Sequence, residues 1–260
     1  MSTSVAELRS ALERRWQGVV PHAAAPVRPG RASGIGDLDA LLGTAGVPAG
    51  QLTELFGARS SGKTMIAFAL LAAAMRDGAL GAFIDPSKSF FAPSAAGAGI
   101  DLRRLIVVRP GDSAGVRRAA DALVRGGACP VVVVDCSESP GALQTHHCAR
   151  LVGQAEKTST TLVVVSNGDL QAVASFASLR LRVHDLTPLW QEGSAGSDRL
   201  LGCVASVDVA KSRAIAPGRS VRFAAVLPDV AGTWPDLCGS AVDRHTLEGS
   251  TGSLQPAARA

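Results

Sequence analysis

Tyrosine is absent from this chain of 260 residues, and most of its 26 basic residues are arginine, so lysine is scarce. Long hydrophobic runs are also missing, since none approaches the roughly 20 apolar residues that a membrane span needs. The N-terminus carries Glu7, Glu13, Arg14 and Arg15 where a signal peptide would need an unbroken apolar stretch. The 5 cysteines show no paired spacing, which fits a reducing compartment better than a disulfide framework. These absences predict a cytoplasmic protein without a membrane segment.

The composition indicates a chain with one large core. Hydrophobic residues make up 47% and charged residues 18%, which provides enough apolar material for a domain of this length. The net charge of +4 permits nucleic-acid binding, but it is too small to establish it.

The N-terminal residues 4–17 are predicted to form a helix that begins with a capping-box pattern at Ser4 and Glu7. Apolar residues recur at helical spacing on one face: Val5, Leu8, Leu12 and Trp16. We assign 1–20 to an N-terminal docking helix and the Pro/Gly/Ala-rich stretch 21–34 to a linker. The apolar face either folds back on its own domain or docks on another subunit or protein.

A core at 35–228 alternates predicted strands and helices, and the acidic, low-complexity residues 229–260 form a loosely ordered tail. The apolar runs are typical of strands buried on both faces of a parallel sheet: Gln51–Phe56, Ala79–Asp85, Leu105–Val108, Val131–Asp135 and Thr161–Ser166. Helices are expected between them at Lys63–Arg76, Ser113–Arg125 and Ala142–Glu156. Three further strands indicate a C-terminal antiparallel extension: Leu179–His184, Leu201–Ala210 and Ser220–Leu227. The fold class is therefore α/β.

The clearest motif is a complete phosphate-binding loop between a strand and a helix. It consists of Gly57, Ala58, Arg59, Ser60, Ser61, Gly62, Lys63 and Thr64. In such a loop the backbone N–H groups face phosphate oxygens, the lysine reaches the β- and γ-phosphates, and the threonine hydroxyl binds Mg²⁺. Asp135, at the end of a later strand, is placed to complete the Mg²⁺ shell. The alternatives are a glycine-rich turn without a ligand and, for Asp135, a helix cap.

Beyond this loop, Gly34 to Leu227 resembles the core of the RecA recombinase. Four segments carry the resemblance, and the first of them ends with the phosphate loop. They are residues 34–64, residues 78–112, residues 175–183 (SFASLRLRV) and residues 204–223 (VASVDVAKSRAIAPGRSVRF). The resemblance implies a RecA-like core, with ATP and Mg²⁺ as weakly held cofactors.

Departures from the family pattern bear on catalysis and on DNA binding. Ser87 stands where the family has the glutamate that polarises the attacking water, and Glu138 is the candidate substitute. Phe91 and Ser94 replace the adenine contacts. Gly168 replaces the glutamine that senses the γ-phosphate, and both DNA-binding loops are shortened. The resemblance therefore implies weak hydrolysis at most, and weak or indirect DNA binding.

One recombinase feature persists in Lys211 and Arg213, which match the basic pair that reaches a neighbouring subunit's ATP in the filament. The alternative is a solvated charge pair at a strand end. With the N-terminal helix and linker, this pair suggests that surfaces for subunit contact are better kept than those for catalysis.

The combination is similar to the ImuA family, the RecA-like (SulA-like) accessory proteins of damage-induced mutagenesis cassettes. That resemblance implies a role in the SOS response and in translesion synthesis. The implied partners are an ImuB-like polymerase-fold protein, an error-prone DNA polymerase and the RecA recombinase, whose filament it would inhibit by subunit mimicry.

Two other functions stay open. One is a DNA-dependent ATPase with recombinase-like activity, which the intact phosphate loop favours. The other is a single-strand DNA binder that recruits a polymerase through the basic N-terminal arm and four arginines: Arg103, Arg104, Arg117 and Arg118.

Overall fold

The computed structural model describes residues 30–43, 46–191 and 199–226. One eight-stranded sheet runs through this part of the chain in the order β3-β2-β4-β5-β1-β6-β7-β8. The first six strands of that order pair in parallel. Strand β7 then pairs antiparallel with β6, and β8 pairs antiparallel with β7. The predicted α/β fold with a C-terminal antiparallel extension is confirmed.

Side chains on both faces of the central strands are buried, which is why these strands are mostly apolar. All residues of β4 are buried and four of its five are valine, as expected for a β-branched strand inside a parallel sheet. The strands are β1 (Leu52–Phe56), β2 (Gly81–Ile84), β3 (Leu105–Val108), β4 (Val131–Asp135), β5 (Thr161–Ser166), β6 (Leu179–Gln191), β7 (Arg199–Ser212) and β8 (Ser220–Val226).

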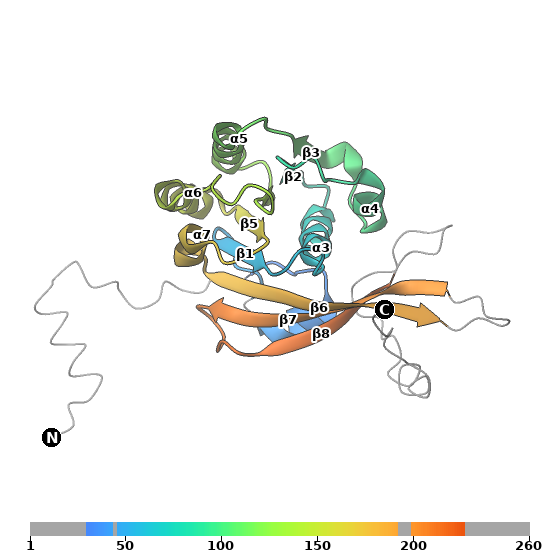
Figure 1. The fold of residues 1–260 in the computed structure, drawn as a ribbon. Coiled ribbons are helices and arrows are strands. Elements are labelled where there is room, and N and C mark those ends of the chain that lie inside the picture. Colours follow the sequence, from blue (N-terminus) through green and yellow to red (C-terminus); the bar gives the residue numbers. More distant parts are fainter. Residues whose placement is uncertain (1–29, 44–45, 192–198, 227–260) are drawn as a thin grey trace, which may run out of the picture.

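Helices cover the sheet on two sides and create two apolar clusters. The first cluster lies under α2 (Gly36–Leu42), α3 (Lys63–Met75) and α4 (Ala92–Gly97). The second lies under α5 (Ser113–Gly126), α6 (Thr145–Thr158) and α7 (Gln171–Phe176). Figure 1 shows α5, α6 and α7 on one side of the parallel strands and α3 and α4 on the other. A short 3₁₀ helix, η2 (Leu102–Arg104), precedes β3.

The start of the core lies within the stretch that the sequence assigns to the linker. Arg31 forms an isolated antiparallel bridge with Val47, and its guanidinium donates to the Ser159 carbonyl at 2.9 Å. Ser33 is fully buried and accepts the backbone N–H of Ile35 at 3.1 Å. Residues 30–34 therefore pack on the core. The predicted docking helix and the tail lie outside the described residues.

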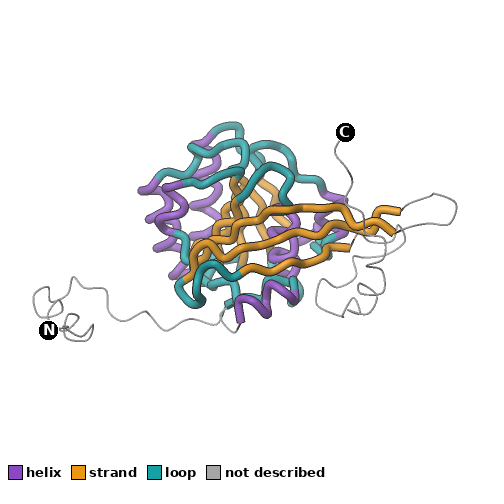
Figure 2. Tube along the Cα trace, turned by 60° about the horizontal axis from the view of Figure 1, so that its bottom comes forward, coloured by secondary structure: helices purple, strands orange, loops and turns teal. Residues whose placement is uncertain are grey.

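The antiparallel strands form a long hairpin beyond the helices. Figure 2 shows β6 and β7 extending past the rest of the fold at one end. Trp190 on this arm lies opposite Leu200, and both side chains are exposed, Trp190 to 48%. A β-bulge between His184 and Thr187 changes the register of β6 where the strand passes the phosphate loop.

An aromatic triad fills the space between α3 and β2. The rings of Phe68, Phe83 and Phe90 lie 5.2 to 5.8 Å apart in edge-on or tilted arrangements. Such contacts add to the burial energy of the rings themselves. Within the described ranges, no helix is long and apolar enough to cross a membrane.

Candidate functional site

The phosphate loop lies between β1 and α3, and two glycines give it its shape. Gly57 has a φ of +154°, and a Cβ there would lie 2.1 Å from the Val183 carbonyl oxygen. Gly62 precedes α3 in the left-handed conformation, with a φ of +99°. The sequence needs glycine at these two points because other residues would clash or be strained. The loop is thereby held against β6.

Lys63 curls back into its own loop. Its Nζ donates to the carbonyl oxygens of Gly57 at 3.0 Å and Ala58 at 2.5 Å, and to Ser61 Oγ at 3.3 Å. The side chain is buried, and this burial lowers the pKa of Lys63, while the Asp135 carboxylate acts in the opposite direction. The loop therefore holds a desolvated ammonium group at its centre, where an incoming phosphate oxygen would meet it.

Asp135 is the last residue of β4. This strand neighbours β5, which in turn neighbours β1, the strand that leads into the phosphate loop. Its Oδ1 accepts the backbone N–H of Ser137 at 2.9 Å, which fixes the direction of the carboxylate. Asp135 and the exposed Thr64 both line the cleft. A carboxylate and a hydroxyl on opposite walls are the protein ligands expected for a phosphate-bound Mg²⁺.

The end of β2 supplies hydroxyl groups instead of a carboxylate to this cleft. Asp85 is fully buried, and it accepts the backbone N–H groups of Ser89 at 2.9 Å and Phe90 at 3.0 Å. Ser87 donates to Asp85 Oδ1 at 3.2 Å and contacts Ser89 Oγ at 2.9 Å. Asp85 therefore holds the segment that follows β2 through these hydrogen bonds. Ser87 lines the cleft at the position where the RecA pattern has a glutamate.

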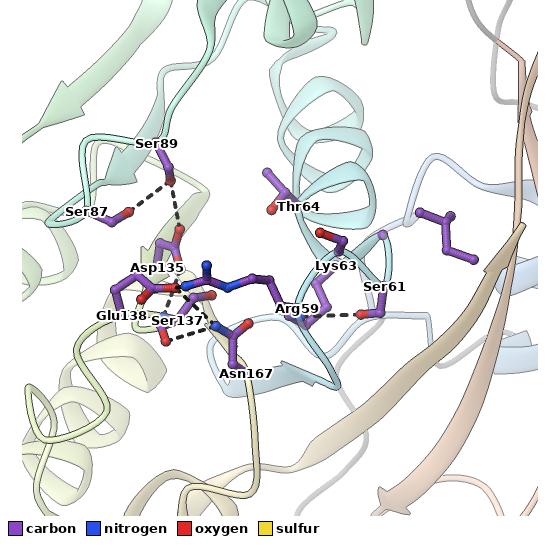
Figure 3. A pocket seen from close by; sticks show the side chains of 13 residues that line it. Arg59, Ser61, Lys63, Thr64, Ser87, Ser89, Asp135, Ser137, Glu138 and Asn167 are labelled. Atoms are coloured by element: carbon purple, nitrogen blue, oxygen red, sulfur yellow. Dashed lines mark hydrogen bonds and ion pairs between the residues drawn. The ribbon is translucent and has the colours of Figure 1, made fainter. Parts of the chain in front are cut away.

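These groups surround an open cleft of about 600 Å³ (Figure 3). The phosphate-loop residues Arg59 to Thr64 and Asp135 lie in its wall, so the structure brings together the predicted nucleotide-binding set. Gly57 and Ala58 contribute their carbonyl groups to Lys63 just behind that wall. The sequence did not single out four further lining residues: Ser89, Ser137, Asn167 and Leu186. Ser137 and Asn167 closely follow the strands that end at Asp135 and Ser166, and this position was the available signal for these two residues.

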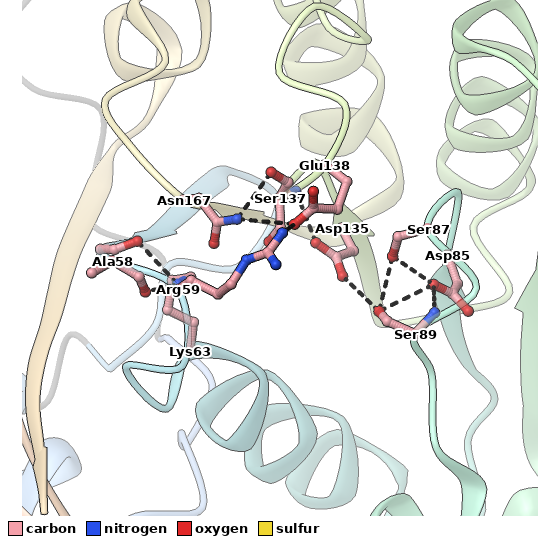
Figure 4. Close-up of polar contacts among 11 residues, drawn as sticks. Ala58, Arg59, Lys63, Asp85, Ser87, Ser89, Asp135, Ser137, Glu138 and Asn167 are labelled. Atoms are coloured by element: carbon pink, nitrogen blue, oxygen red, sulfur yellow. Dashed lines mark hydrogen bonds and ion pairs between the residues drawn. The ribbon is translucent and has the colours of Figure 1, made fainter.

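A polar bridge crosses the cleft from the phosphate loop to the ends of β4 and β5. The Arg59 guanidinium pairs with the Glu138 carboxylate. Asn167 Nδ2 donates to Glu138 Oε1 at 3.3 Å and to the Ser137 carbonyl at 3.1 Å. Figure 4 shows Arg59 reaching from the loop toward Glu138 and Asn167. We call these three residues the cleft latch.

A buried ion pair supports the sheet behind the cleft. Arg180 Nε on β6 lies 2.5 Å from Glu54 Oε2 on β1, and Arg180 also pairs with Asp169 at 2.5 Å. Ser166 Oγ, at the end of β5, donates to the other Glu54 oxygen at 3.4 Å. Burial raises the pKa of Glu54, although the Arg180 charge opposes that shift. The Arg180 guanidinium also stacks 4.5 Å from the centre of the Phe56 ring.

The predicted interface residues do not line the cleft. Lys211 lies on β7, and its Nζ donates to the carbonyl oxygens of Ala174 at 2.9 Å and Ser175 at 3.4 Å, at the end of α7. Arg213 follows β7 and is exposed. The helix α7 occupies the place where the sequence predicted a shortened DNA-binding loop. The other predicted interface residues lie outside the described residues: Val5, Leu8, Leu12 and Trp16.

The four arginines considered for DNA binding each have a partner within the chain. Arg103 and Arg104 pair with Asp101, the first at 3.0 Å and the second at 3.9 Å. Arg118 lies 4.0 Å from Asp112, and Arg117 donates to the Ala142 carbonyl at 3.3 Å. These contacts reduce the positive charge that this surface presents to a phosphate backbone.

The strand order, the phosphate loop between β1 and α3, and the aspartate ending β4 define a RecA-like α/β core. Residues 30–147 match the family model of the RecA N-terminal domain. This stretch is therefore similar to the RecA N-terminal domain, in agreement with the resemblance that the sequence motifs indicated.

RecA proteins match this chain over a longer stretch than the family model does. Protein RecA of Clostridioides difficile is 28% identical over 219 residues, which cover 72% of this chain and 62% of that protein. Protein RecA of Geobacter metallireducens is 28% identical over 246 residues, covering 82% and 71%. Protein RecA of Rubrobacter xylanophilus is 30% identical over 219 residues, covering 72% and 62%. Two of these three matches therefore span less than two thirds of the relative.

Among solved structures, the crystal structure of the RadB recombinase is similar to this chain. The match has a TM-score of 0.58 and 19% sequence identity, and it covers 75% of this chain and 95% of that one. This match supports the RecA-like fold.

Proposed function

We propose that this chain is a RecA-like accessory protein of the DNA-damage response that binds a nucleotide and modulates the RecA filament by subunit mimicry. In this role it lacks recombinase activity of its own. It inhibits strand exchange and acts beside translesion polymerases during SOS mutagenesis.

One contrast within the cleft carries the proposal. The phosphate-binding wall is complete, with Lys63 buried in its loop and Asp135 facing Thr64 across the cleft. At the end of β2, by contrast, the hydroxyl of Ser87 lines the cleft. A hydroxyl cannot orient and deprotonate the attacking water as a carboxylate does. These residues fit ATP held through Lys63 and Mg²⁺ held by Thr64 and Asp135, with slow turnover.

The α7 helix supports the loss of strand exchange. The link between β5 and β6 is short and folds as a helix that Lys211 ties down through two carbonyl groups. A tethered helix cannot extend along a DNA strand as a long loop can. The RecA-like sheet is retained, so the chain can match a recombinase subunit in shape without supplying its DNA contacts.

The polymerase partners follow from the resemblance to the ImuA family. They are an ImuB-like polymerase-fold protein and an error-prone DNA polymerase. The predicted N-terminal helix, with Val5, Leu8, Leu12 and Trp16 on one face, is the candidate docking element.

Co-sedimentation with purified RecA filaments on single-stranded DNA tests the mimicry. We expect the full chain to bind the filament and to slow strand exchange, and we expect Arg213→Ala to weaken both effects. Arg103→Ala, which changes an exposed arginine far from β7, is the matched control. Absence of association, with and without ATP and DNA, would refute the proposal.

A second candidate, a DNA-dependent ATPase, is favoured by one specific observation. The Glu138 carboxylate lies in the cleft wall beside Asp135, where it could act on a water molecule in place of the missing glutamate. Phosphate release by the wild type, Glu138→Gln and Lys63→Ala discriminates the two. Rapid DNA-stimulated turnover that both substitutions abolish would favour the ATPase.

A further inference from the structure

Arg59 is the phosphate-loop residue whose side chain leaves the loop altogether. Its guanidinium is 75% exposed and spans the cleft to Glu138, which is 47% exposed. Asn167 holds the same Glu138 carboxylate oxygen from the end of β5. The cleft latch therefore ties the phosphate loop to the ends of β4 and β5 across the cleft (Figure 4).

The charges of the side chains that line the cleft sum to zero. Among the described residues that line the cleft, Lys63 and Arg59 are cationic and Asp135 and Glu138 are anionic. A nucleoside triphosphate stays negatively charged even with one Mg²⁺ bound, so it needs a cation that is not already neutralised. Arg59 becomes that cation only when it leaves Glu138.

The exchange of partners is energetically favourable. An exposed ion pair contributes little to stability, so separating Arg59 from Glu138 costs little. A guanidinium binds two phosphate oxygens side by side, and such charge-assisted hydrogen bonds are stronger than neutral ones. With the β-phosphate held by Lys63, a third phosphate would lie farther into the cleft, whose lining includes Asp135, Ser137 and Glu138. Arg59 already crosses the cleft to that wall.

We propose that Arg59 and Glu138 form a γ-phosphate-specific switch. A nucleoside triphosphate takes the Arg59 guanidinium away from Glu138, whereas a diphosphate leaves the cleft latch closed. This inference rests on the proposed nucleotide site and adds how that site distinguishes its two nucleotide states.

The loop that receives the signal follows from the connectivity. Glu138 belongs to residues 136–144, which join β4 to α6. Departure of Arg59 removes one of the two contacts of the Glu138 carboxylate, while Asn167 still holds Glu138 and the Ser137 carbonyl. The nucleotide state is thus read at the β4–α6 loop. Gly168, at the end of β5, has no side chain with which to sense a phosphate.

Calorimetric titration of the full chain with Mg²⁺-ADP and with Mg²⁺-AMP-PNP, a non-hydrolysable triphosphate, tests the switch. Arg59→Gln should weaken AMP-PNP binding at least about tenfold, as expected for one lost charge-assisted pair, and change ADP binding less than about twofold. Glu138→Gln keeps the shape of the side chain but removes its charge, so it should tighten AMP-PNP binding about threefold or more and leave ADP unchanged. Arg103→Gln, which removes another exposed arginine–acid pair, should change neither.

Hydrogen exchange of residues 137–144 provides a second measurement. Exchange should be faster with AMP-PNP than with ADP in the wild type and equal with both in Arg59→Gln. Equal weakening of both nucleotides by Arg59→Gln, or no gain of AMP-PNP affinity in Glu138→Gln, overturns the switch while the nucleotide site stands. If the wild type binds neither nucleotide and Lys63→Ala behaves identically, the nucleotide site itself is wrong and the switch falls with it.

Discussion

Glu54 and Arg180 form an ion pair inside the sheet, joining β1 to β6 with 2.5 Å between Oε2 and Nε. Glu54 is fully buried, and the Arg180 side chain is only 13% exposed. Burying two charges is unfavourable by itself, so this pair depends on the continued presence of both partners.

Removing one partner should therefore be severe. Arg180→Met leaves the Glu54 carboxylate buried without a counter-charge, and we expect a loss of about 3–5 kcal/mol in the free energy of unfolding. Urea unfolding followed by circular dichroism measures it. Arg182→Met is the control, because its pair with Asp208 is exposed and should contribute less than about 1 kcal/mol. Equal losses in the two variants would contradict a special role for the buried pair.

Two glycine-to-alanine substitutions should have opposite effects. Gly57→Ala places a Cβ 2.1 Å from the Val183 carbonyl, so we expect a loss of about 1–3 kcal/mol in stability and weaker nucleotide binding as the loop shifts. In Gly153→Ala the new methyl group on α6 meets nothing within 4 Å, and helix propensity should raise stability by about 0.5–1 kcal/mol. Thermal unfolding distinguishes them. A stable Gly57→Ala protein with normal ADP affinity would show that the loop does not need its contact with β6.

The His184–Asp208 pair on β6 and β7 should make stability depend on pH. Its nitrogen and oxygen lie 3.0 Å apart, Asp185 holds the other ring nitrogen at 2.8 Å, and Arg182 also pairs with Asp208. Although burial acts in the opposite direction on both groups, the hydrogen bonds raise the pKa of His184 above its ordinary 6.5 and lower the pKa of Asp208 below its ordinary 3.8.

The sign of the dependence follows from these two shifts. The raised pKa of His184 contributes stability that is fully present below pH 6.5 and is lost as the pH rises through the shifted pKa. The lowered pKa of Asp208 contributes stability that is present above pH 3.8. His184→Gln should therefore lower the free energy of unfolding more at about pH 6 than at about pH 9. Urea titrations at the two pH values measure the difference, and the same loss at both would exclude a charged His184.

Substitutions of Lys211 and Arg213 should distinguish a role in stability from a role in partner binding. Lys211→Ala removes the donor at the end of α7, and we expect a loss of about 1 kcal/mol together with faster hydrogen exchange in Gln171–Phe176. Arg213→Ala changes an exposed side chain and should leave both measurements unaltered while weakening association with RecA. If Arg213→Ala lowers stability as much as Lys211→Ala, its effect on RecA association cannot be assigned to a contact.

The buried strands could be predicted from the sequence almost residue by residue. Val131–Asp135 and Thr161–Ser166 are apolar on both faces, and their predicted bounds match the structure. The helix after β4 was predicted from Ala142, but it begins at Thr145. Ala142 and Leu143 are buried like helix residues, yet they precede the Gln144 cap. Apolar character alone does not distinguish a buried turn from a helix.

The candidate site also contains a part that the sequence predicts and a part that it does not. Its phosphate-binding half is a local motif, so the sequence reveals it directly. The Glu138–Arg59 and Glu54–Arg180 pairs join residues that are 79 and 126 positions apart, and no local pattern connects them. The short helices α4 and α7 were also missed, because six residues contain too few turns to show a periodic apolar face.

The exposed ring of Trp190 determines what intrinsic fluorescence of the described fold reports. This indole lies on the arm formed by β6 and β7, whereas the interior aromatic triad consists of phenylalanine alone. Indole emission responds to the polarity around the ring, so Trp190 emission reports on the arm and on any molecule that covers it. Unfolding of the interior aromatic triad changes this emission little, because the triad contains no tryptophan. In a variant with Trp16→Phe and Trp234→Phe, a blue shift on adding a protein that lacks tryptophan would therefore mark contact at the arm.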